Sequence, residues 1–414
     1  MDKAKPFEIS KREVWEAYKQ VKANRGAAGV DGESLTQFEQ DLGNNLYRLW
    51  NRMSSGSYMP KPVRRVYIPK GDGRMRPLGI PAVADRIAQM VVKRYLEPIL
   101  DPLFHADSYG YRPGRSAHHA LVQARKRCWE HDWVLDLDIK GFFDNIDHDL
   151  LMRAVRKHTN CRWVLLYIER WLTAPVQMPD GTEASSPGRG TPQGGVISPL
   201  LANLFLHYAF DLWMQREHPG IPFERYADDV ICHCATEAKA QSLRQSLQAR
   251  LAECKLEMHP EKTKVVYCRD ANRRGDFPVY KFDFLGFEFR PRESKNRFTG
   301  KLFVAFTPAI SPKAAKRLRL EIRRWRLHLR TDLSFPELMD WIRPMVIGWC
   351  RYYGRFHKSA LVPALRTLDH YLMRWAVRKF RSLRGSPERG WEWLQGIQSQ
   401  HPDLLPIWGL PEVG

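Results

Sequence analysis

Apolar residues recur at helical spacing in the first hundred positions, and shorter alternating runs lie between the helical stretches. Val14, Tyr18 and Val21 form one apolar stripe, and a capping-box pattern at 10–13 precedes it, so this stretch predicts the first helix. The Asp72-Gly73 pair predicts a hairpin turn. The same patterns predict further helices over about 34–50 and 84–100, and strands over 63–68 and 75–80.

The middle third mixes strand-like and helix-like segments without a regular alternation. The mostly apolar run 133–139 is typical of a central strand, and a helix is expected to begin at Ser198-Pro199, with Ser198 as its N-cap. The patterns also predict helices over 148–158, 163–172 and 236–254, hairpin strands over 225–234 and 282–289, and a Gly/Pro/Ser-rich loop over 176–192. This mixture indicates an α+β fold.

From Ser311 onward the pattern is helical, and a domain boundary is expected near 295–311. Two apolar stripes predict the core of this region. They consist of Leu318, Ile322, Trp325 and Leu329, and of Leu361, Leu365, Leu368, Leu372 and Trp375. Arginines occupy much of the opposite face, with few acidic residues to pair with them.

The charge of the chain points to a polyanionic partner. The 414 residues carry a net charge of +20, with a pI near 9.7. Residues 301–389 hold 20 basic and 6 acidic residues. Nucleic acid is the leading partner, and an anionic membrane surface is the alternative. No apolar run approaches the about 20 residues of a membrane span, and residues 1–10 contain no secretory apolar segment.

The seven cysteines form no C-x-x-C pair. A disulfide framework or a zinc knuckle is therefore not expected, and a reducing cytosol suits the composition.

The candidate chemistry lies in acidic residues within apolar surroundings. Tyr226-Ala227-Asp228-Asp229 stands between apolar runs, and Asp138 ends a strand-like segment about 90 residues earlier. Adjacent strand residues point to opposite faces, so the two aspartates converge only if they occupy a turn. Two Mg²⁺ ions would compensate such carboxylates. Taken alone, the tetrapeptide also fits a solvated turn, and Asp136 competes with Asp138 on the same strand face.

An ordered series of motifs makes the catalytic interpretation specific. The chain resembles the reverse transcriptases, and most closely the group II intron-encoded enzymes called maturases, over roughly residues 10–385. The motifs are Arg76-Pro77-Leu78-Gly79-Ile80-Pro81, the SYGYRPGRS run 108–116, DIKGFFD at 138–144, TPQGGVISP at 191–199, the YADD box at 226–229, FLGF at 284–287 and GWCRYY at 348–353.

The resemblance implies a right-hand polymerase architecture followed by an all-helical thumb. Fingers with an N-terminal helical extension are expected over 1–130, the palm over 131–295, and the thumb or maturase domain over 311–385. A short tail that resembles a DNA-binding segment is expected over 386–414. The implied activity is RNA-directed DNA polymerisation with two Mg²⁺ ions, for which Mn²⁺ is a possible substitute.

The resemblance also assigns roles to single residues. Asp138 and Asp228 match the principal metal ligands, and Asp229 matches the third acidic position. Phe143 matches the aromatic gate that disfavours a ribose 2′-OH, and Gln193 matches the glutamine beside the incoming nucleotide. Two further residues match the finger cations that hold the triphosphate: Lys70 and Arg76.

Each of these roles has a simpler structural alternative. Phe143 also fits a core position, Gln193 a polar loop and Lys70 a solvated turn. The basic segments add candidate nucleic-acid contacts at Arg112, Arg115, Arg317, Arg323, Arg324, Arg374 and Arg378.

The implied partners are a group II intron RNA, an RNA template, a DNA primer, deoxynucleoside triphosphates and target DNA, but no membrane. Assistance to splicing and retrohoming is expected, in a bacterial cytoplasm and near the nucleoid when DNA is the substrate. About 30 residues follow Arg384, which favours the class that lacks an endonuclease and depends on an existing primer. A reverse transcriptase without an intron and a non-enzymatic splicing factor remain alternatives. The oligomeric state stays open.

Overall fold

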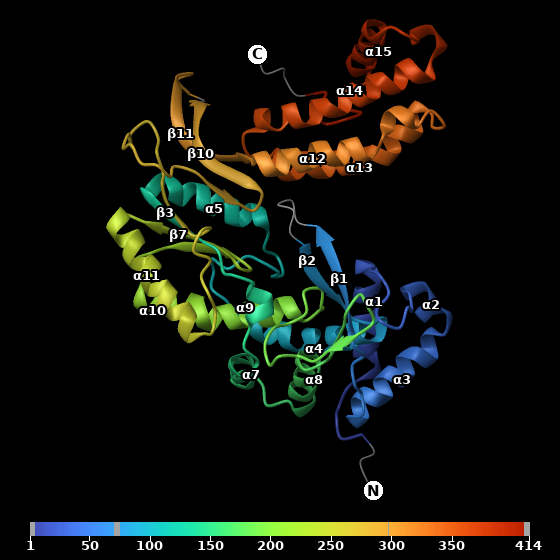
Figure 1. Cartoon of the computed structure of the whole chain (residues 1–414), viewed down its shortest axis with the longest axis vertical. Helices are drawn as coiled ribbons and strands as arrows, with labels where there is room; N and C mark the ends of the chain where they lie inside the picture. The colour runs from blue at the N-terminus through green and yellow to red at the C-terminus, as the bar shows by residue number, and fades with distance from the viewer. Residues whose placement is uncertain (1–4, 70–74, 297, 410–414) are drawn as a thin grey trace. The chain divides into compact units, whose positions relative to one another are not determined.

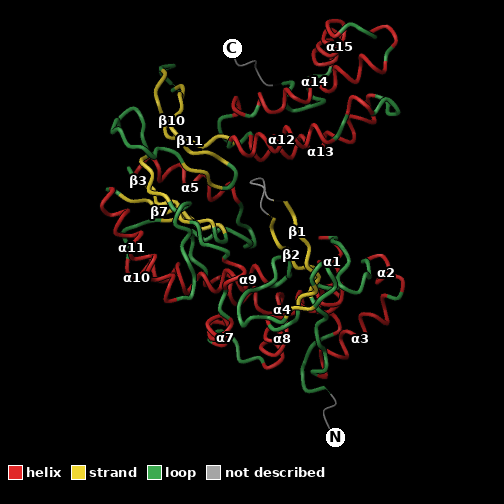
Figure 2. The backbone as a smooth tube through the Cα atoms, viewed as in Figure 1, coloured by secondary structure: helices red, strands yellow, loops and turns green. Residues whose placement is uncertain are grey.

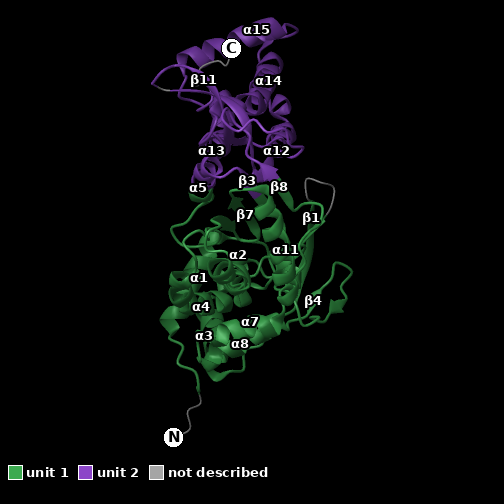
Figure 3. Ribbon diagram, turned by 90° about the vertical axis from the view of Figure 1, so that its left-hand side faces the viewer, with its two compact units in different colours: residues 1–120, 135–265 green, residues 121–134, 266–414 purple. Residues whose placement is uncertain are grey.

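A computed structural model describes residues 5–69, 75–296 and 298–409 of the chain (Figure 1). It divides into two compact units (Figure 3). Unit 1 comprises residues 1–120 and 135–265, and unit 2 comprises residues 121–134 and 266–414. The chain passes between the units within α5 (Ala117–Glu130), β3 (Trp133–Leu137) and β8 (Lys264–Tyr267).

Four helices form the N-terminal part of unit 1: α1 (Lys11–Asn24), α2 (Leu35–Gln40), α3 (Leu42–Ser55) and α4 (Val83–Leu100). Ser10 caps α1 by accepting a hydrogen bond from the Glu13 amide at 3.1 Å, and the predicted stripe of α1 is buried. The helix expected over 34–50 is instead two helices, because Asp41 leaves the helical conformation with φ −127° and ψ 46°.

A four-stranded sheet in unit 1 contains the predicted hairpin. Strands β1 (Val63–Pro69) and β2 (Met75–Ile80) are antiparallel, and β1 also pairs in parallel with β4 (Val176–Gln177). Strand β5 (Glu183–Ala184) completes the order β2-β1-β4-β5, so part of the expected loop 176–192 joins a sheet. The predicted turn at Asp72-Gly73 and the candidate Lys70 lie outside the described residues.

The second sheet has the order β6-β7-β3-β8, and two of its strands, β3 and β7, are labelled in Figure 2. The predicted acidic residues lie in or directly beside its strands. Strands β6 (Phe223–Tyr226) and β7 (Asp229–Cys234) form the expected antiparallel hairpin. The accompanying helices are η1 (Asp101–Leu103), α6 (Phe142–Asn145), α7 (His148–Arg156), α8 (Arg162–Leu172), α9 (Ser198–Leu206), the π-helix η2 (His207–Asp211), α10 (Leu212–Glu217) and α11 (Glu237–Glu253).

The predicted N-cap of α9 is wrong by one residue. Ile197 is the N-cap and Ser198 is the first helical residue. The Ser198 hydroxyl instead accepts a hydrogen bond from the Thr191 hydroxyl at 2.8 Å, and both residues are buried. This contact ties the start of α9 to the TPQGG segment, so tertiary packing has replaced the local cap.

Unit 2 combines a three-stranded sheet with a helical region. The sheet has the order β11-β10-β9 and consists of β9 (Phe282–Phe284), β10 (Phe287–Lys295) and β11 (Leu302–Ile310). The hairpin over 282–289 is confirmed. Strand β11, however, lies where only a domain boundary was expected. The helices are α12 (Pro312–Arg324), η3 (Leu327–Leu329), α13 (Phe335–Tyr353), η4 (Lys358–Ala360), α14 (Val362–Lys379), η5 (Arg381–Leu383) and α15 (Pro387–Gln400).

The apolar stripes of unit 2 are confirmed with one exception. All five predicted residues from Leu361 to Trp375 are buried, as are Leu318, Ile322 and Trp325. Leu329 is 48% exposed. Helix α12 ends at Arg324, and Arg326 has φ 49°, so the chain turns before Leu329 and removes it from the stripe.

Candidate active site

A two-residue turn places two adjacent aspartates at the end of the β6–β7 hairpin. Tyr226 pairs with Asp229 across the hairpin, and Ala227 adopts φ 57°, in the left-handed region. Asp228 thus lies in the expected turn, whereas Asp229 is the first residue of β7. Asp138 follows the last residue of β3, which neighbours β7 in the same sheet. The fold therefore gathers at one sheet end the three aspartates that the sequence separates by about 90 residues.

The three carboxylates interact electrostatically. Desolvation of its carboxylate, together with the negative charges of Asp228 and Asp138, raises the pKa of Asp229 to about 7. Burial also raises the pKa of Asp228, and the charge of Asp138 adds to this shift. The Asp229 side chain still meets solvent, so it lines an open site rather than the core. The cluster holds more negative charge than its surroundings neutralise, which suits a cation-binding site.

Lys262 is a functional candidate that the sequence analysis missed. Its Nζ lies 2.9 Å from Oδ2 of Asp138, and both side chains are partly exposed. The Asp138 amide also donates to the Thr263 hydroxyl at 3.3 Å, while the Asp138 carbonyl accepts from the His259 amide at 2.8 Å. The segment 259–263 thus supports Asp138 from a position about 120 residues later, where no local pattern indicates the contact.

A buried polar network holds the turn between Tyr226 and Asp229. Arg225 is fully buried and donates two hydrogen bonds to the Asp211 carboxylate, at 2.7 and 2.6 Å. Its Nη1 donates to Oδ1 of Asn203 at 2.9 Å and to the Ala227 carbonyl at 3.1 Å. This network was not predicted from the sequence, although a charged residue within an apolar strand indicates a buried polar partner.

The SYGY motif packs directly on the same turn. The Tyr109 amide donates to the Arg225 carbonyl at 2.8 Å, and Asn203 donates to the Gly110 carbonyl at 2.7 Å. A Cβ atom at Gly110 would lie 2.4 Å from the Ala227 nitrogen. Only glycine permits this approach, which explains the residue type at this place in the motif.

Of the described residues expected around the nucleotide, Gln193 lines a cleft in unit 1, whereas Phe143 and Arg76 are not among its lining residues. Phe142 is buried, whereas Phe143 is half-buried, and the Phe143 carbonyl accepts a hydrogen bond from the Thr191 amide at 2.8 Å. The Gly79 amide donates to the Gln193 carbonyl at 2.8 Å, so the PLGI and TPQGG motifs meet. A cleft of about 400 Å³ is lined by Gln193 and Asp144, among other residues.

Arg76 is exposed on β2. Its positive charge opposes the rise in the pKa values of Asp228 and Asp229. It therefore acts on the aspartate cluster, as a residue that holds a triphosphate would need to do. Its role in binding a nucleotide stays a prediction.

The structure gives Arg112 a role different from the expected nucleic-acid contact. Its side chain is 7% exposed and pairs with Asp101 at 2.7 Å. It also donates to the carbonyls of His105, Ser108 and Asp101, so its guanidinium stabilises the basic loop. Arg115 is exposed and lies over the Tyr109 ring at 5.7 Å, which leaves it available to a phosphate.

The basic residues predicted in unit 2 occupy two kinds of environment. Arg317 donates to the Tyr353 hydroxyl at 2.8 Å, and Arg378 donates to the His328 carbonyl at 3.5 Å. The other three, which are Arg323, Arg324 and Arg374, line one surface pocket. All five are exposed.

The donor set of the aspartate cluster fits divalent metal ions. Carboxylate oxygens are the ligands that Mg²⁺ prefers, and Mg²⁺ completes its shell with water and substrate phosphates. Within the described ranges, no three acidic, histidine or cysteine side chains already converge on one metal position. Metal binding by Asp138, Asp228 and Asp229 stays a prediction.

The comparisons with known proteins agree with this geometry. Residues 68–289 match the family described as "Reverse transcriptase (RNA-dependent DNA polymerase)", and residues 315–393 match the "Group II intron, maturase-specific domain". The first match spans more than half of the chain and includes all three aspartates. The chain belongs to the reverse transcriptase family, in the branch that carries a group II intron maturase domain.

Individual relatives cover different parts of the chain. Protein YkfC of Escherichia coli is 34% identical over 296 residues, which are 62% of this chain and 77% of YkfC. The group II intron-encoded protein LtrA of Lactococcus lactis is 36% identical over 194 residues, 46% of this chain and 32% of LtrA. A putative COX1/OXI3 intron 1 protein of Saccharomyces cerevisiae is 30% identical over 48% of this chain and 24% of its own length. The chain thus spans about a third or less of these two intron proteins.

In the part of the chain that the structure describes, no helix is both long and apolar enough to cross a membrane.

Proposed function

We propose that this reverse transcriptase serves a mobile group II intron. It extends a DNA primer on an RNA template with deoxynucleoside triphosphates, and it binds the intron RNA to assist splicing and retrohoming into target DNA. The observation that carries the polymerase part is the meeting of Asp138, Asp228 and Asp229 at one sheet end, with the pKa values of Asp228 and Asp229 raised.

Two bound Mg²⁺ ions would supply activation of the primer 3′-OH and stabilisation of the leaving pyrophosphate. The chain itself contributes the carboxylates. The Arg225 network holds the β6–β7 turn that carries Asp228. Lys262 balances the charge of Asp138 at 2.9 Å, and Arg76 contributes positive charge near Asp228 and Asp229. Phe143 and Gln193 are proposed to flank the sugar and base of the incoming nucleotide.

The intron part of the proposal depends on unit 2. The maturase match over 315–393 includes most of the basic helix α12 and all of the basic helix α14, and LtrA is by its name encoded in a group II intron. The tail after residue 386 is packed: Trp408 donates to Asp369 at 2.9 Å, and Trp393 lies 6.1 Å from Trp375. A DNA-binding role of this tail and action near the bacterial nucleoid, in the cytoplasm, belong to the same proposal.

Primer extension tests the polymerase part of this proposal. The purified full chain, given an RNA template, a DNA primer, deoxynucleotides and Mg²⁺, should extend the primer, and omission of the divalent ion should abolish extension. Asp228→Asn removes one negative charge with little change in shape, so extension should fall by about two orders of magnitude or more while RNA binding is retained.

A matched pair of variants separates Asp136 of β3 from Asp138, which directly follows this strand. Asp138→Asn should abolish extension, whereas Asp136→Asn, the same chemical change two residues earlier, should retain it. Normal extension by Asp228→Asn would remove this residue from the mechanism. Splicing assistance without extension by the wild type would favour the non-enzymatic splicing factor, and extension without intron binding would favour an intron-free enzyme.

A further inference from the structure

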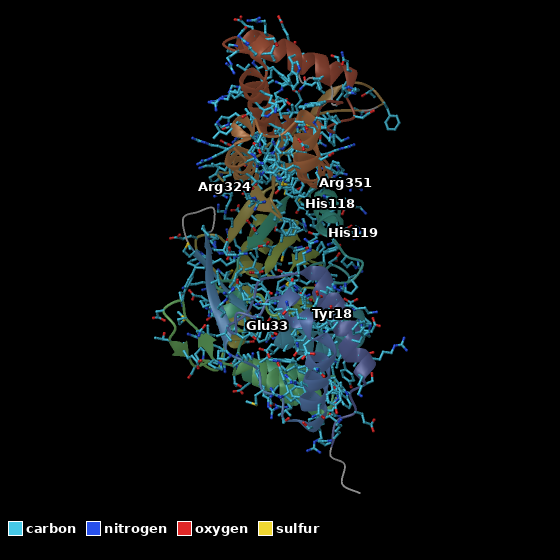
Figure 4. All side chains as sticks on the ribbon, turned by 90° about the vertical axis from the view of Figure 1, so that its right-hand side faces the viewer. Tyr18, Glu33, His118, His119, Arg324 and Arg351 are labelled. Atoms are coloured by element: carbon cyan, nitrogen blue, oxygen red, sulfur yellow. The ribbon has the colours of Figure 1, made fainter. Side chains whose placement is uncertain are left out.

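Unit 2 contains a surface pocket of about 590 Å³ built by α12, η3, α14 and the segment between α12 and η3. Helix α12 contributes Arg323 and Arg324, helix α14 contributes Tyr371 and Arg374, and the segment between α12 and η3 contributes Arg326. We call this surface the arginine pocket (Arg324 is labelled in Figure 4). Its volume lies in the about 300–1,000 Å³ range of pockets that hold small ligands.

The arginine pocket is strongly cationic. Four arginines line it, and none of its lining residues is acidic. Arg324 has an exposed partner, Glu321, at 3.6 Å. Among the described residues, no ion pair engages Arg323, Arg326 or Arg374. Partial burial lowers the pKa of His328, and the positive charges of Arg374, Arg378 and Arg326 lower it further. Positive potential therefore converges at this ring.

One side of the arginine pocket is aromatic and apolar. The rings of His328 and Tyr371 lie 5.4 Å apart, and Leu320 and Leu329 are 45% and 48% exposed beside them. An aromatic face next to several guanidinium groups matches the two parts of a nucleotide, because a base stacks on an aromatic ring while arginines bind its phosphates.

The frame of the arginine pocket is anchored in the core. Trp325, which lies between Arg324 and Arg326 in the sequence, is buried and stacks on Trp349 with a centroid distance of 5.3 Å and an interplanar angle of 3°. Leu327 is fully buried, and Arg326 turns the chain with φ 49°. The backbone that carries Arg324 and Arg326 is therefore held by packed neighbours.

From this arrangement we infer that the arginine pocket holds one unstacked nucleotide of the bound RNA. The base lies against Tyr371, and the flanking phosphates are bound by Arg323, Arg326 and Arg374. The inference rests on the proposed binding of RNA by this domain and adds a specific site to it. Paired RNA keeps its bases stacked, so the pocket should distinguish a bulged or single-stranded nucleotide from a continuous duplex.

Binding of two RNA hairpins tests this inference on the full chain. One hairpin carries a single bulged 2-aminopurine nucleotide, and the other is the same hairpin without the bulge. The wild type should bind the bulged hairpin more tightly. Tyr371→Ala should weaken binding of the bulged hairpin about fivefold or more and leave the paired hairpin unaffected, since stacking of a base on an aromatic residue contributes this much. Tyr371→Phe keeps the ring and should retain the preference.

The arginines have a matched control on the same helix. Arg323→Gln should reduce the preference for the bulged hairpin, whereas Arg319→Gln, an exposed residue of α12 outside the arginine pocket, should not. Equal binding of the two hairpins by the wild type overturns the inference, as does identical behaviour of Tyr371→Ala and Tyr371→Phe. Equally tight binding of free adenosine monophosphate also overturns it.

Primer extension and hairpin binding together distinguish failure of the arginine pocket from failure of the proposed function. If the wild type extends a primer and binds both hairpins equally, only the arginine pocket fails. If it binds neither hairpin, the inference and the proposed RNA role fail together.

Discussion

At the residue scale, two adjacent phenylalanines show how burial separates structure from function. Phe142 is 2% exposed and packs into the core, whereas Phe143 is half-buried, with the two ring centroids 5.4 Å apart. The backbone of Phe143 is fixed by the Thr191 amide, which belongs to the same loop as Gln193. A partly exposed ring on a fixed backbone is suited to exclude a ribose 2′-OH by shape.

Phe143→Ala should therefore raise the incorporation of ribonucleotides relative to deoxyribonucleotides. Removal of the ring creates space for a 2′-OH, and relief of a clash of about 1.4 kcal/mol or more corresponds to about tenfold or more in the ratio. Steady-state incorporation of each nucleotide opposite the same template base measures it.

Phe142→Ala provides the contrast. Loss of this buried ring should lower the free energy of unfolding by about 3–5 kcal/mol without a specific change in the ratio. An unchanged ratio in a folded Phe143→Ala protein would assign Phe143 to the core as well.

At the element scale, the β6–β7 turn depends on a neighbouring loop rather than on its own sequence. The Gly110 position approaches the Ala227 nitrogen so closely that a methyl group would lie 2.4 Å away. On the opposite side, the Arg225 side chain donates to the Ala227 carbonyl at 3.1 Å. The turn that carries Asp228 is thus held from two directions.

Gly110→Ala should displace this turn and lower primer extension by about 100-fold, because a shift of about 1 Å at a catalytic group has an effect of this size. Extension measured at saturating template and primer isolates the chemical step. Gly43→Ala is the matched control: Gly43 lies in α3 with no atom within 4 Å of an added Cβ, so the change should leave extension intact and stabilise the helix by about 0.5–1 kcal/mol. Full activity of Gly110→Ala would show that the turn tolerates displacement.

At the scale of the whole molecule, the charge is divided unevenly along the chain. Residues 301–389 carry 20 basic and 6 acidic residues, whereas the aspartate cluster lies in unit 1. We therefore expect binding of RNA and polymerisation to depend on separate residues, and variants to affect them separately.

Replacement of Arg323 and Arg324 together by Gln should reduce the slope of log affinity against log salt by about 1.5, because each phosphate contact contributes about 0.7–0.9. RNA binding titrated at several salt concentrations measures this slope. The same charge loss at Lys239 and Arg244 on α11, outside the basic segment, should leave it unchanged. We expect intron splicing to be lost in the double arginine variant and kept in Asp228→Asn. Equal loss of splicing in both would contradict the separation.

The sequence alone determined the features that depend on local order. Hydrophobic periodicity located most helices, the β1–β2 and β6–β7 hairpins and the apolar stripe of α14, because each reflects contacts within one or two turns of chain. The order of the motifs identified the family and the three aspartates. The net charge of 301–389 indicated a polyanionic partner. Strand β11 was not predicted: it pairs with β10 in the segment where only a domain boundary was expected.

Only the tertiary structure decided what surrounds those residues. Lys262 reaches Asp138 from 124 positions away, and Arg225 meets Asp211 and Asn203 on other elements. Arg112 was expected to contact nucleic acid, but its guanidinium donates to carbonyl groups of its own loop. The arginine pocket forms because α12 ends at Arg324 and the chain then turns toward α14. Such contacts arise from packing between distant segments, and periodicity along the chain carries no information about which distant segments pack together.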